Sequence, residues 1–155
     1  MVVNDFVDRH GQERGKMMHL APVEILQRIF AESRTIAVVG LSPKTNRPSN
    51  QVALYMQHAG YRIIPVNPGQ TMILGETCYP DLQSIPEQVD VVDIFRRPEL
   101  VEPIVLDAVT IGAKVVWMQQ GIVNEEAAKV AEQAGLTVLM DRCMKVDHMQ
   151  FADKS

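Results

Sequence analysis

Five runs of apolar, strongly β-forming residues are spaced along the chain, at 35–40, 61–67, 89–95, 113–119 and 136–140. Such continuous runs are typical of strands that are buried on both faces of a sheet. Between the runs, apolar residues recur every three or four positions at 49–60, 98–112 and 125–135, and a similar segment, 21–34, precedes the first run. That spacing predicts amphipathic helices.

The alternation of strands and helices predicts an α/β fold: a three-layer, Rossmann-like, doubly wound parallel sheet of five strands. With the strands numbered along the chain, we expect the order 3-2-1-4-5 and a switch point between strands 1 and 4. Ligands bind such sheets outside the carboxyl ends of the strands, at the switch point. Pro65 is awkward for a central position in its strand, because it has no backbone N–H to donate.

The two ends of the chain differ from this pattern. Residues 1–20 are polar and of mixed charge, with Gly11 and Gly15 as breakers, so we expect a flexible N-terminal arm. Residues 141–155 follow the last predicted strand and are expected to form a tail. The length of 155 residues suits a single domain, which we place at 21–155.

Composition narrows the possible partners. The chain has a net charge of −4, and 46% of its residues are apolar, as in ordinary globular proteins. An acidic protein has no general electrostatic attraction to nucleic acid or to an anionic membrane. The sequence shows no signal peptide, no apolar run near the ~18 residues of a membrane span and no zinc-ligand spacing. We therefore expect a cytoplasmic protein without a metal, a nucleic-acid partner or a membrane partner.

Several cations nonetheless follow the predicted strands. Lys44 and Arg47 lie in the loop after the first strand, Arg96 and Arg97 follow the third, and Arg142 follows the fifth. The carboxyl ends of parallel strands share one edge, where the helix that opens at 48–49 also presents the positive end of its dipole. This combination predicts a site for a multiply charged anion.

The sequence around this site does not match the motifs of a standard dinucleotide-binding protein. Gly40 begins the loop, but Ser42 stands where the second glycine of GxGxxG belongs. An NAD site also carries an acid at the end of the second strand to bind the ribose hydroxyls, and here the sequence reads PVNPG. A P-loop motif is missing as well.

Other chemistry in the sequence is sparse. Ser42 has no evident base beside it, and the four histidines share no spacing. Asp93 lies inside a predicted strand, where we expect a nearby cation to pair with it. Cys143 is the one candidate nucleophile on the ligand edge, because Arg142 and Lys145 flank it and cations can lower the pKa of a thiol. The interpretation we favour is nevertheless an ordinary semi-buried thiol.

Longer stretches resemble a known family. They read IAVVGLSPKTNRPSNQVALYMQHAGYRIIPVNPG, GETCYPDLQSIPEQVDVVDIFRRPE, IGAKVVWMQQGIVNEEAA and VLMDRCMKVDH. In this order they look like the small stand-alone coenzyme A-binding proteins. Those proteins are similar to the amino-terminal CoA-binding domain of succinyl-CoA synthetase α-subunits and of ADP-forming acyl-CoA synthetases. The resemblance covers roughly residues 22–151.

The resemblance implies CoA as the ligand, in contact with eleven positions. Those implied to meet the phosphates are Gly40, Ser42, Lys44, Arg47 and Ser49. Those implied to line the adenine and ribose pocket are Asn67, Pro68, Phe95, Arg96 and Arg97. Gln119 would approach the pantetheine. The synthetases carry a further domain with a phosphorylated histidine and an ATP-grasp partner, so their ligase activity is not implied.

The sequence thus favours a protein that binds CoA or an acyl-CoA without catalysis of its own. An NAD(P)-binding redox enzyme or sensor on a variant Rossmann loop stays open, as does a mixed disulfide between Cys143 and the CoA thiol.

Overall fold

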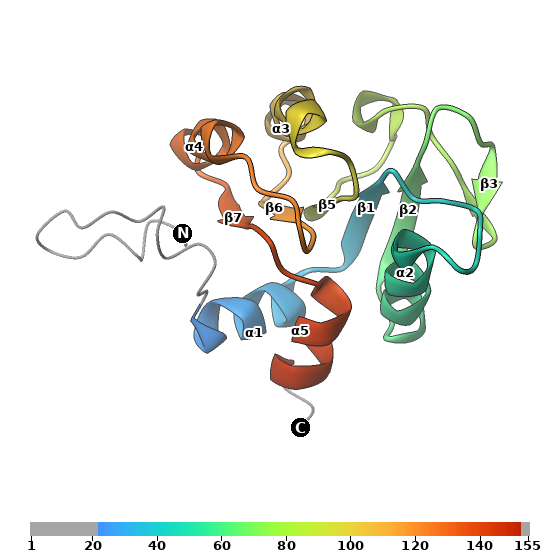
Figure 1. The fold of residues 1–155 in the computed structure, drawn as a ribbon, viewed down its shortest axis with the longest axis horizontal. Coiled ribbons are helices and arrows are strands. Elements are labelled where there is room, and N and C mark those ends of the chain that lie inside the picture. The colour runs from blue at the N-terminus through green and yellow to red at the C-terminus, as the bar shows by residue number, and fades with distance from the viewer. Residues whose placement is uncertain (1–21, 153–155) are drawn as a thin grey trace, which may run out of the picture.

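The computed structural model describes residues 22–152, and its centre is a parallel sheet of five strands (Figure 1). In spatial order the strands are β2 (Arg62–Val66), β1 (Thr35–Val39), β5 (Val91–Ile94), β6 (Val115–Met118) and β7 (Thr137–Leu139). Almost every residue of these strands is buried, as the continuous apolar runs predict. The N-terminal arm expected at 1–20 lies outside the described residues.

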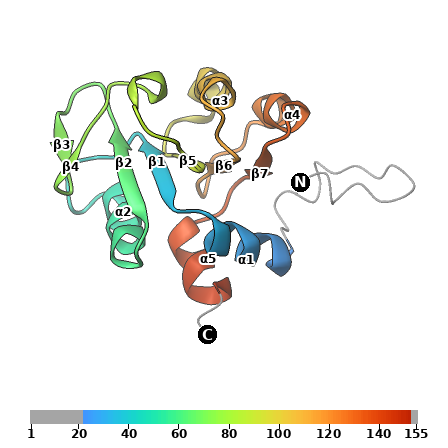
Figure 2. The ribbon, with the colours of Figure 1, turned by 180° about the vertical axis from the view of Figure 1, so that it is seen from behind.

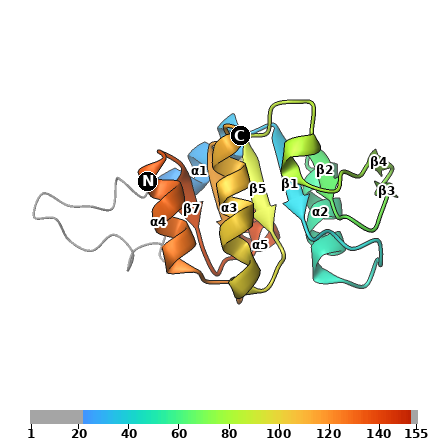
Figure 3. The same ribbon diagram turned by 90° about the horizontal axis from the view of Figure 1, so that it is seen from above.

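Helices cover both faces of the sheet (Figures 1 and 2). One face carries α1 (Val23–Glu32), α2 (Pro48–His58) and α5 (Met144–Phe151). The other carries α3 (Val101–Thr110), which a 3-10 turn at Pro98–Leu100 precedes, and α4 (Glu125–Gln133). Figure 3 shows α3 and α4 side by side over the sheet. The predicted three-layer, doubly wound class is confirmed. None of the helices among residues 22–152 is long and apolar enough to cross a membrane.

The place of one strand differs from the prediction. The segment 89–95, expected outside β2, forms β5 and pairs directly with β1. The place beyond β2 instead holds a single parallel bridge between Val66 and Tyr79. When this bridge is counted as the third strand, the sheet reads 3-2-1-4-5-6, which is the expected 3-2-1-4-5 arrangement with one further strand, β7, at its end. The switch point therefore lies between β1 and β5.

The segment after β2 explains why that outer position is so short. Residues 68–81 form a small hairpin of β3 (Met72–Ile73) and β4 (Glu76–Thr77), and then only Tyr79 reaches the sheet. Pro65 O accepts a hydrogen bond from Tyr79 N at 3.0 Å. The C=O and N–H of one strand residue point to the same side, so the missing N–H of Pro65 faces this sparsely paired edge, where proline is tolerated.

The predicted tail is wrong for most of its length, because 144–151 form α5. This helix packs on α1, and His148 contacts the ring of Phe30 with the centroids 5.0 Å apart. Just before the helix, Arg142 O accepts the indole N–H of the fully buried Trp117 at 2.9 Å. The low amphipathicity of 144–151 concealed the helix, which tertiary packing stabilises.

Asp93 is the unusual member of this core. It lies in β5 between Val38 of β1 and Trp117 of β6, and 1% of its surface is exposed. Its Oδ1 has no hydrogen-bond partner among the described residues, so the cation expected beside it is not there. Burial raises the pKa of the Asp93 carboxyl well above its usual range.

This burial predicts a pH-dependent stability. A raised pKa in the folded state means that the stabilising contribution is complete below the unfolded pKa, near 4. It is lost as the pH rises through the folded-state pKa. We expect Asp93→Asn to remove this loss and to raise the free energy of unfolding at neutral pH by about 1–3 kcal/mol. Urea denaturation from pH 4 to pH 8 measures it, and parallel pH profiles for both proteins would contradict the prediction.

Candidate functional site

The loop after β1 begins at a glycine that no other residue replaces without strain. Gly40 has φ +85°, and a Cβ added to it would lie 2.3 Å from Phe95 O. Gly40 N donates to Val66 O at 2.9 Å. The missing side chain thus allows the ends of β1, β2 and β5 to meet at one point, and the loop 41–47 starts from there.

The first turn of α2 holds this loop in place. Ser49 Oγ accepts from Ser42 N at 3.0 Å, and Asn50 Nδ2 donates to Ser42 O at 2.9 Å. Ser42 Oγ in turn accepts from Lys44 N at 3.1 Å. Each serine hydroxyl thus uses an acceptor lone pair inside the loop, which leaves its O–H free to donate to a ligand.

These residues enclose an open cleft of about 340 Å³ at the carboxyl edge. Its lining consists of Gly40, Ser42, Lys44, Arg47, Pro48, Ser49 and Phe95. No carboxylate among residues 22–152 pairs with Lys44 or Arg47. Arg47 is the N-cap of α2 and makes no side-chain capping bond. The cleft therefore combines unpaired cations, hydroxyl donors and a helix N-terminus, which together favour an anion.

A second cavity, of about 230 Å³, lies on the other side of the same strand ends. Its lining is apolar at Val39, Val66, Pro68, Pro80, Leu82, Leu100 and Ile104, and charged at Arg96, Asp81 and Asp107. Arg96 also passes close to the first cleft, because its Cδ lies 3.0 Å from the position that a Gly40 Cβ would take. Arg96 therefore lines the second cavity and lies next to Gly40, which lines the first cleft.

Asn67, directly after β2, connects the two loops at this edge. Its Nδ2 donates to Leu41 O at 3.0 Å, and its Oδ1 accepts from Gly69 N at 2.9 Å. Its backbone N–H donates to Tyr79 O at 2.9 Å. The side chain is thus engaged within the protein and fixes the loop after β1 against the loop after β2.

A model of the CoA binding domain matches residues 34–149, which include all of these loops. The chain belongs to the CoA-binding domain family.

Relatives of this CoA-binding domain are both small and large proteins. The chain is 46% identical over 125 residues to Uncharacterized protein YneT of Bacillus subtilis, covering 81% of the chain and 90% of that protein. The structure of a hypothetical protein from Pyrococcus horikoshii OT3 matches with a TM-score of 0.83 and 40% identity, covering 84% and 92% of the two chains. Acetate–CoA ligase [ADP-forming] I of Archaeoglobus fulgidus is 26% identical over 82% of this chain, which spans 20% of that ligase.

Not every cation predicted for the CoA-binding edge reaches the two cavities. The side chain of Arg97 is 76% exposed and lies 4.0 Å from Glu99. Arg142 forms a close ion pair with Asp147, with Nε and Oδ2 2.6 Å apart. The cations at the cavities are therefore Lys44, Arg47 and Arg96.

Gln119 and Cys143 lie further along the edge, near α5. Gln119 is 4% exposed, and its Oε1 accepts from Met144 N at 3.2 Å, a bond that holds the start of α5. Cys143 is a half-buried free thiol at the N-cap of the same helix, and Cys78 is a buried one. No group of three potential metal ligands occurs in the described part of the chain.

Sequence reasoning missed Asn50 and the apolar wall of the second cavity. Asn50 is 2% exposed, and a polar residue on the buried side of the first helical turn was the available signal. Leu82, Leu100 and Ile104 come from segments that approach the strand ends only in the folded chain.

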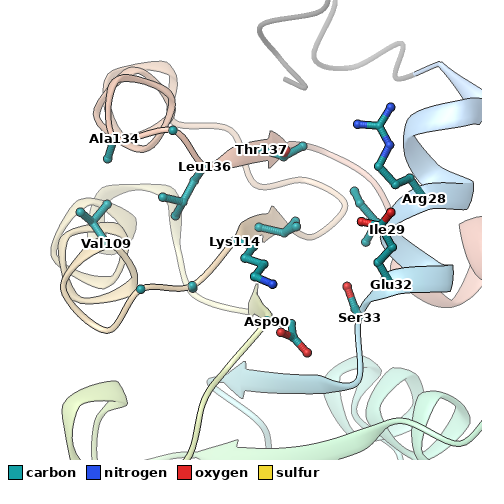
Figure 4. A pocket seen from close by; sticks show the side chains of 14 residues that line it. Arg28, Ile29, Glu32, Ser33, Asp90, Val109, Lys114, Ala134, Leu136 and Thr137 are labelled. Carbon is teal, nitrogen blue, oxygen red and sulfur yellow. The ribbon is translucent and has the colours of Figure 1, made fainter.

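A larger cavity, of about 500 Å³, lies at the opposite edge of the sheet (Figure 4). Its charged lining is mixed, with Arg28 and Lys114 beside Glu32 and Asp90. The C-terminal ends of α3 and α4 border it at Gly112 and Gly135. Helix C-termini repel anions. The smaller clefts at the carboxyl edge are therefore better suited to a ligand that carries phosphates.

The close approach at Gly40 yields a stability prediction with an internal control. Gly60 also has a positive φ, +103°, but no atom lies within 4 Å of the position of its missing Cβ. Gly40→Ala and Gly60→Ala therefore share the backbone strain, and only the first forces a clash with Phe95 O. We expect Gly40→Ala to lower the free energy of unfolding by about 1–3 kcal/mol more than Gly60→Ala. Urea denaturation measures both, and equal losses would contradict the prediction.

Proposed function

We propose that this protein binds coenzyme A or an acyl-CoA at the carboxyl edge of the sheet, as a binding module without catalysis of its own. The observation that carries the proposal is the cleft of the loop 40–49, where Lys44, Arg47, two hydroxyl donors and the start of α2 converge in a CoA-binding domain.

The phosphates of CoA suit the first cleft. Ser42 and Ser49 would donate their O–H groups to phosphate oxygens, and Lys44 and Arg47 would neutralise the charge. The first-turn N–H groups of a helix have no partner within the helix, so those of α2 would add further donors. A pyrophosphate and a ribose phosphate together need several cations, which this loop supplies in place of the glycines of a dinucleotide finger.

The adenine and its ribose suit the second cavity. Pro68, Leu100 and Ile104 offer apolar contact to a planar base, and the Arg96 guanidinium would stack on it or reach the ribose phosphate. Phe95 lines the phosphate cleft beside it. Arg97 and Gln119 border neither cavity, so their contacts with the adenosine and the pantetheine stay predictions.

The similarity to these relatives does not assign a reaction to this protein. The ligase activity named for the Archaeoglobus protein belongs to a chain of which this one spans a fifth. No comparison supports the NAD(P) alternative, and Asn67 stands where an NAD site has its acid. The cytoplasmic location stays a prediction from the sequence.

Calorimetric titration of the purified protein with CoA, dephospho-CoA and NAD tests the proposal. We expect CoA to bind most tightly, because it carries one more phosphate than dephospho-CoA for the cations to neutralise. We also expect its affinity to fall as salt is added. Tighter binding of NAD than of CoA would overturn the proposal.

Arg47 gives a second test with a matched control. Arg47→Ala removes an unpaired cation from the cleft and should weaken CoA binding by about 1.5–3 kcal/mol, the scale of a hydrogen bond to a charged group. Arg28→Ala removes an exposed arginine at the opposite edge and should leave the affinity unchanged. An unchanged affinity for Arg47→Ala would exclude Arg47 from the site.

A further inference from the structure

The residue after β2 decides which ribose a Rossmann-like sheet accepts. In dinucleotide-binding proteins this position carries an Asp or Glu that accepts hydrogen bonds from the ribose hydroxyls. The adenosine ribose therefore lies at the end of this strand. In this protein the position is occupied by Asn67, which is neutral and follows Val66 directly.

The amide of Asn67 is held in one orientation by the chain itself. Leu41 O requires a donor and Gly69 N requires an acceptor, so only the observed placement of Nδ2 and Oδ1 satisfies both. A carboxylate could still accept from Gly69 N, but its other oxygen would face Leu41 O, and two acceptors repel each other. The loops at this edge are therefore built around an amide rather than an acid.

The cavity beside Asn67 already contains two carboxylates, Asp81 and Asp107, and one cation, Arg96. Pro68, the residue after Asn67, lines this cavity as well. A carboxylate at position 67 would add a third negative charge beside the place where a ribose phosphate would lie. The amide adds none, so no further carboxylate opposes the attraction between Arg96 and the phosphate.

We propose that Asn67 is a specificity-determining residue, whose neutral, internally held amide favours a 3′-phosphorylated ribose over an unphosphorylated one. The proposal rests on the proposed function, because it concerns the adenosine end of bound CoA. It adds a role for Asn67 that is separate from direct contact with the base.

The test compares two ligands that differ only in the 3′-phosphate, CoA and dephospho-CoA, on variants of residue 67. Asn67→Ala removes the bonds to Leu41 and Gly69 without adding charge. We expect this variant to weaken the binding of CoA and of dephospho-CoA by a similar factor. The ratio of the two affinities should stay within about twofold of the wild-type ratio.

Asn67→Asp adds a charge at the same position. We expect the ratio of CoA affinity to dephospho-CoA affinity to fall by about tenfold or more relative to Asn67→Ala, and the effect to shrink as salt screens the charge. Asn67→Lys adds the opposite charge and should raise the ratio, which keeps the test valid if the Asp variant does not fold. Thermal unfolding identifies any variant that is not folded.

The outcomes separate the two proposals. A wild-type protein that binds neither ligand overturns the proposed function. A wild-type protein that binds CoA, with folded charged variants that leave the ratio unchanged, overturns the role of Asn67 alone. A ratio that falls with Asp or rises with Lys supports it.

Discussion

The close approach of β1 and β5 at Gly40 is the constraint on which the ligand edge depends. Phe95 O occupies the space that any side chain at position 40 would need, and Gly40 N bonds to the neighbouring strand at Val66. The three strand ends are thereby brought together at the switch point of the sheet, and the loop after β1 leaves from a fixed position toward α2. The phosphate cleft and the second cavity lie on either side of this junction.

Around that junction, polar groups are satisfied within the protein in a way that leaves donors for a ligand. Ser42 and Ser49 accept backbone N–H groups and keep their own O–H groups, while Asn50 and Asn67 hold loop carbonyls. The serine oxygens thus accept hydrogen bonds from the protein, and the serine O–H groups remain able to donate to a ligand. An anion needs such donors. The unpaired Lys44 and Arg47 add positive charge, although the protein as a whole is acidic.

In the core beneath this edge, by contrast, one polar side chain is buried with an oxygen that has no hydrogen-bond partner among the described residues. Asp93 lies between apolar neighbours with one oxygen unpartnered, and its burial favours the protonated form. The start of α5 is held more conventionally, through Gln119 and the ion pair of Arg142 with Asp147. Arg142 therefore supports the fold at this edge, and the cations at the two cavities are Lys44, Arg47 and Arg96.

The sequence by itself determined the strands, four of the helices, the family and most of the phosphate loop, because these depend on local periodicity and on short motifs near Gly40. Only the tertiary structure decided that 89–95 pairs with β1, since strand neighbours are chosen by packing between segments far apart in the chain. It also showed that 144–151 form a helix, because the packing of this helix on α1 is a contact between segments far apart in the chain. Of five candidate cations it brought Lys44, Arg47 and Arg96 to the cavities and left Arg97 in solvent and Arg142 paired. The partners of individual side chains, such as Asp147 for Arg142 and Leu41 for Asn67, come together only in the folded chain, and no sequence pattern predicts them.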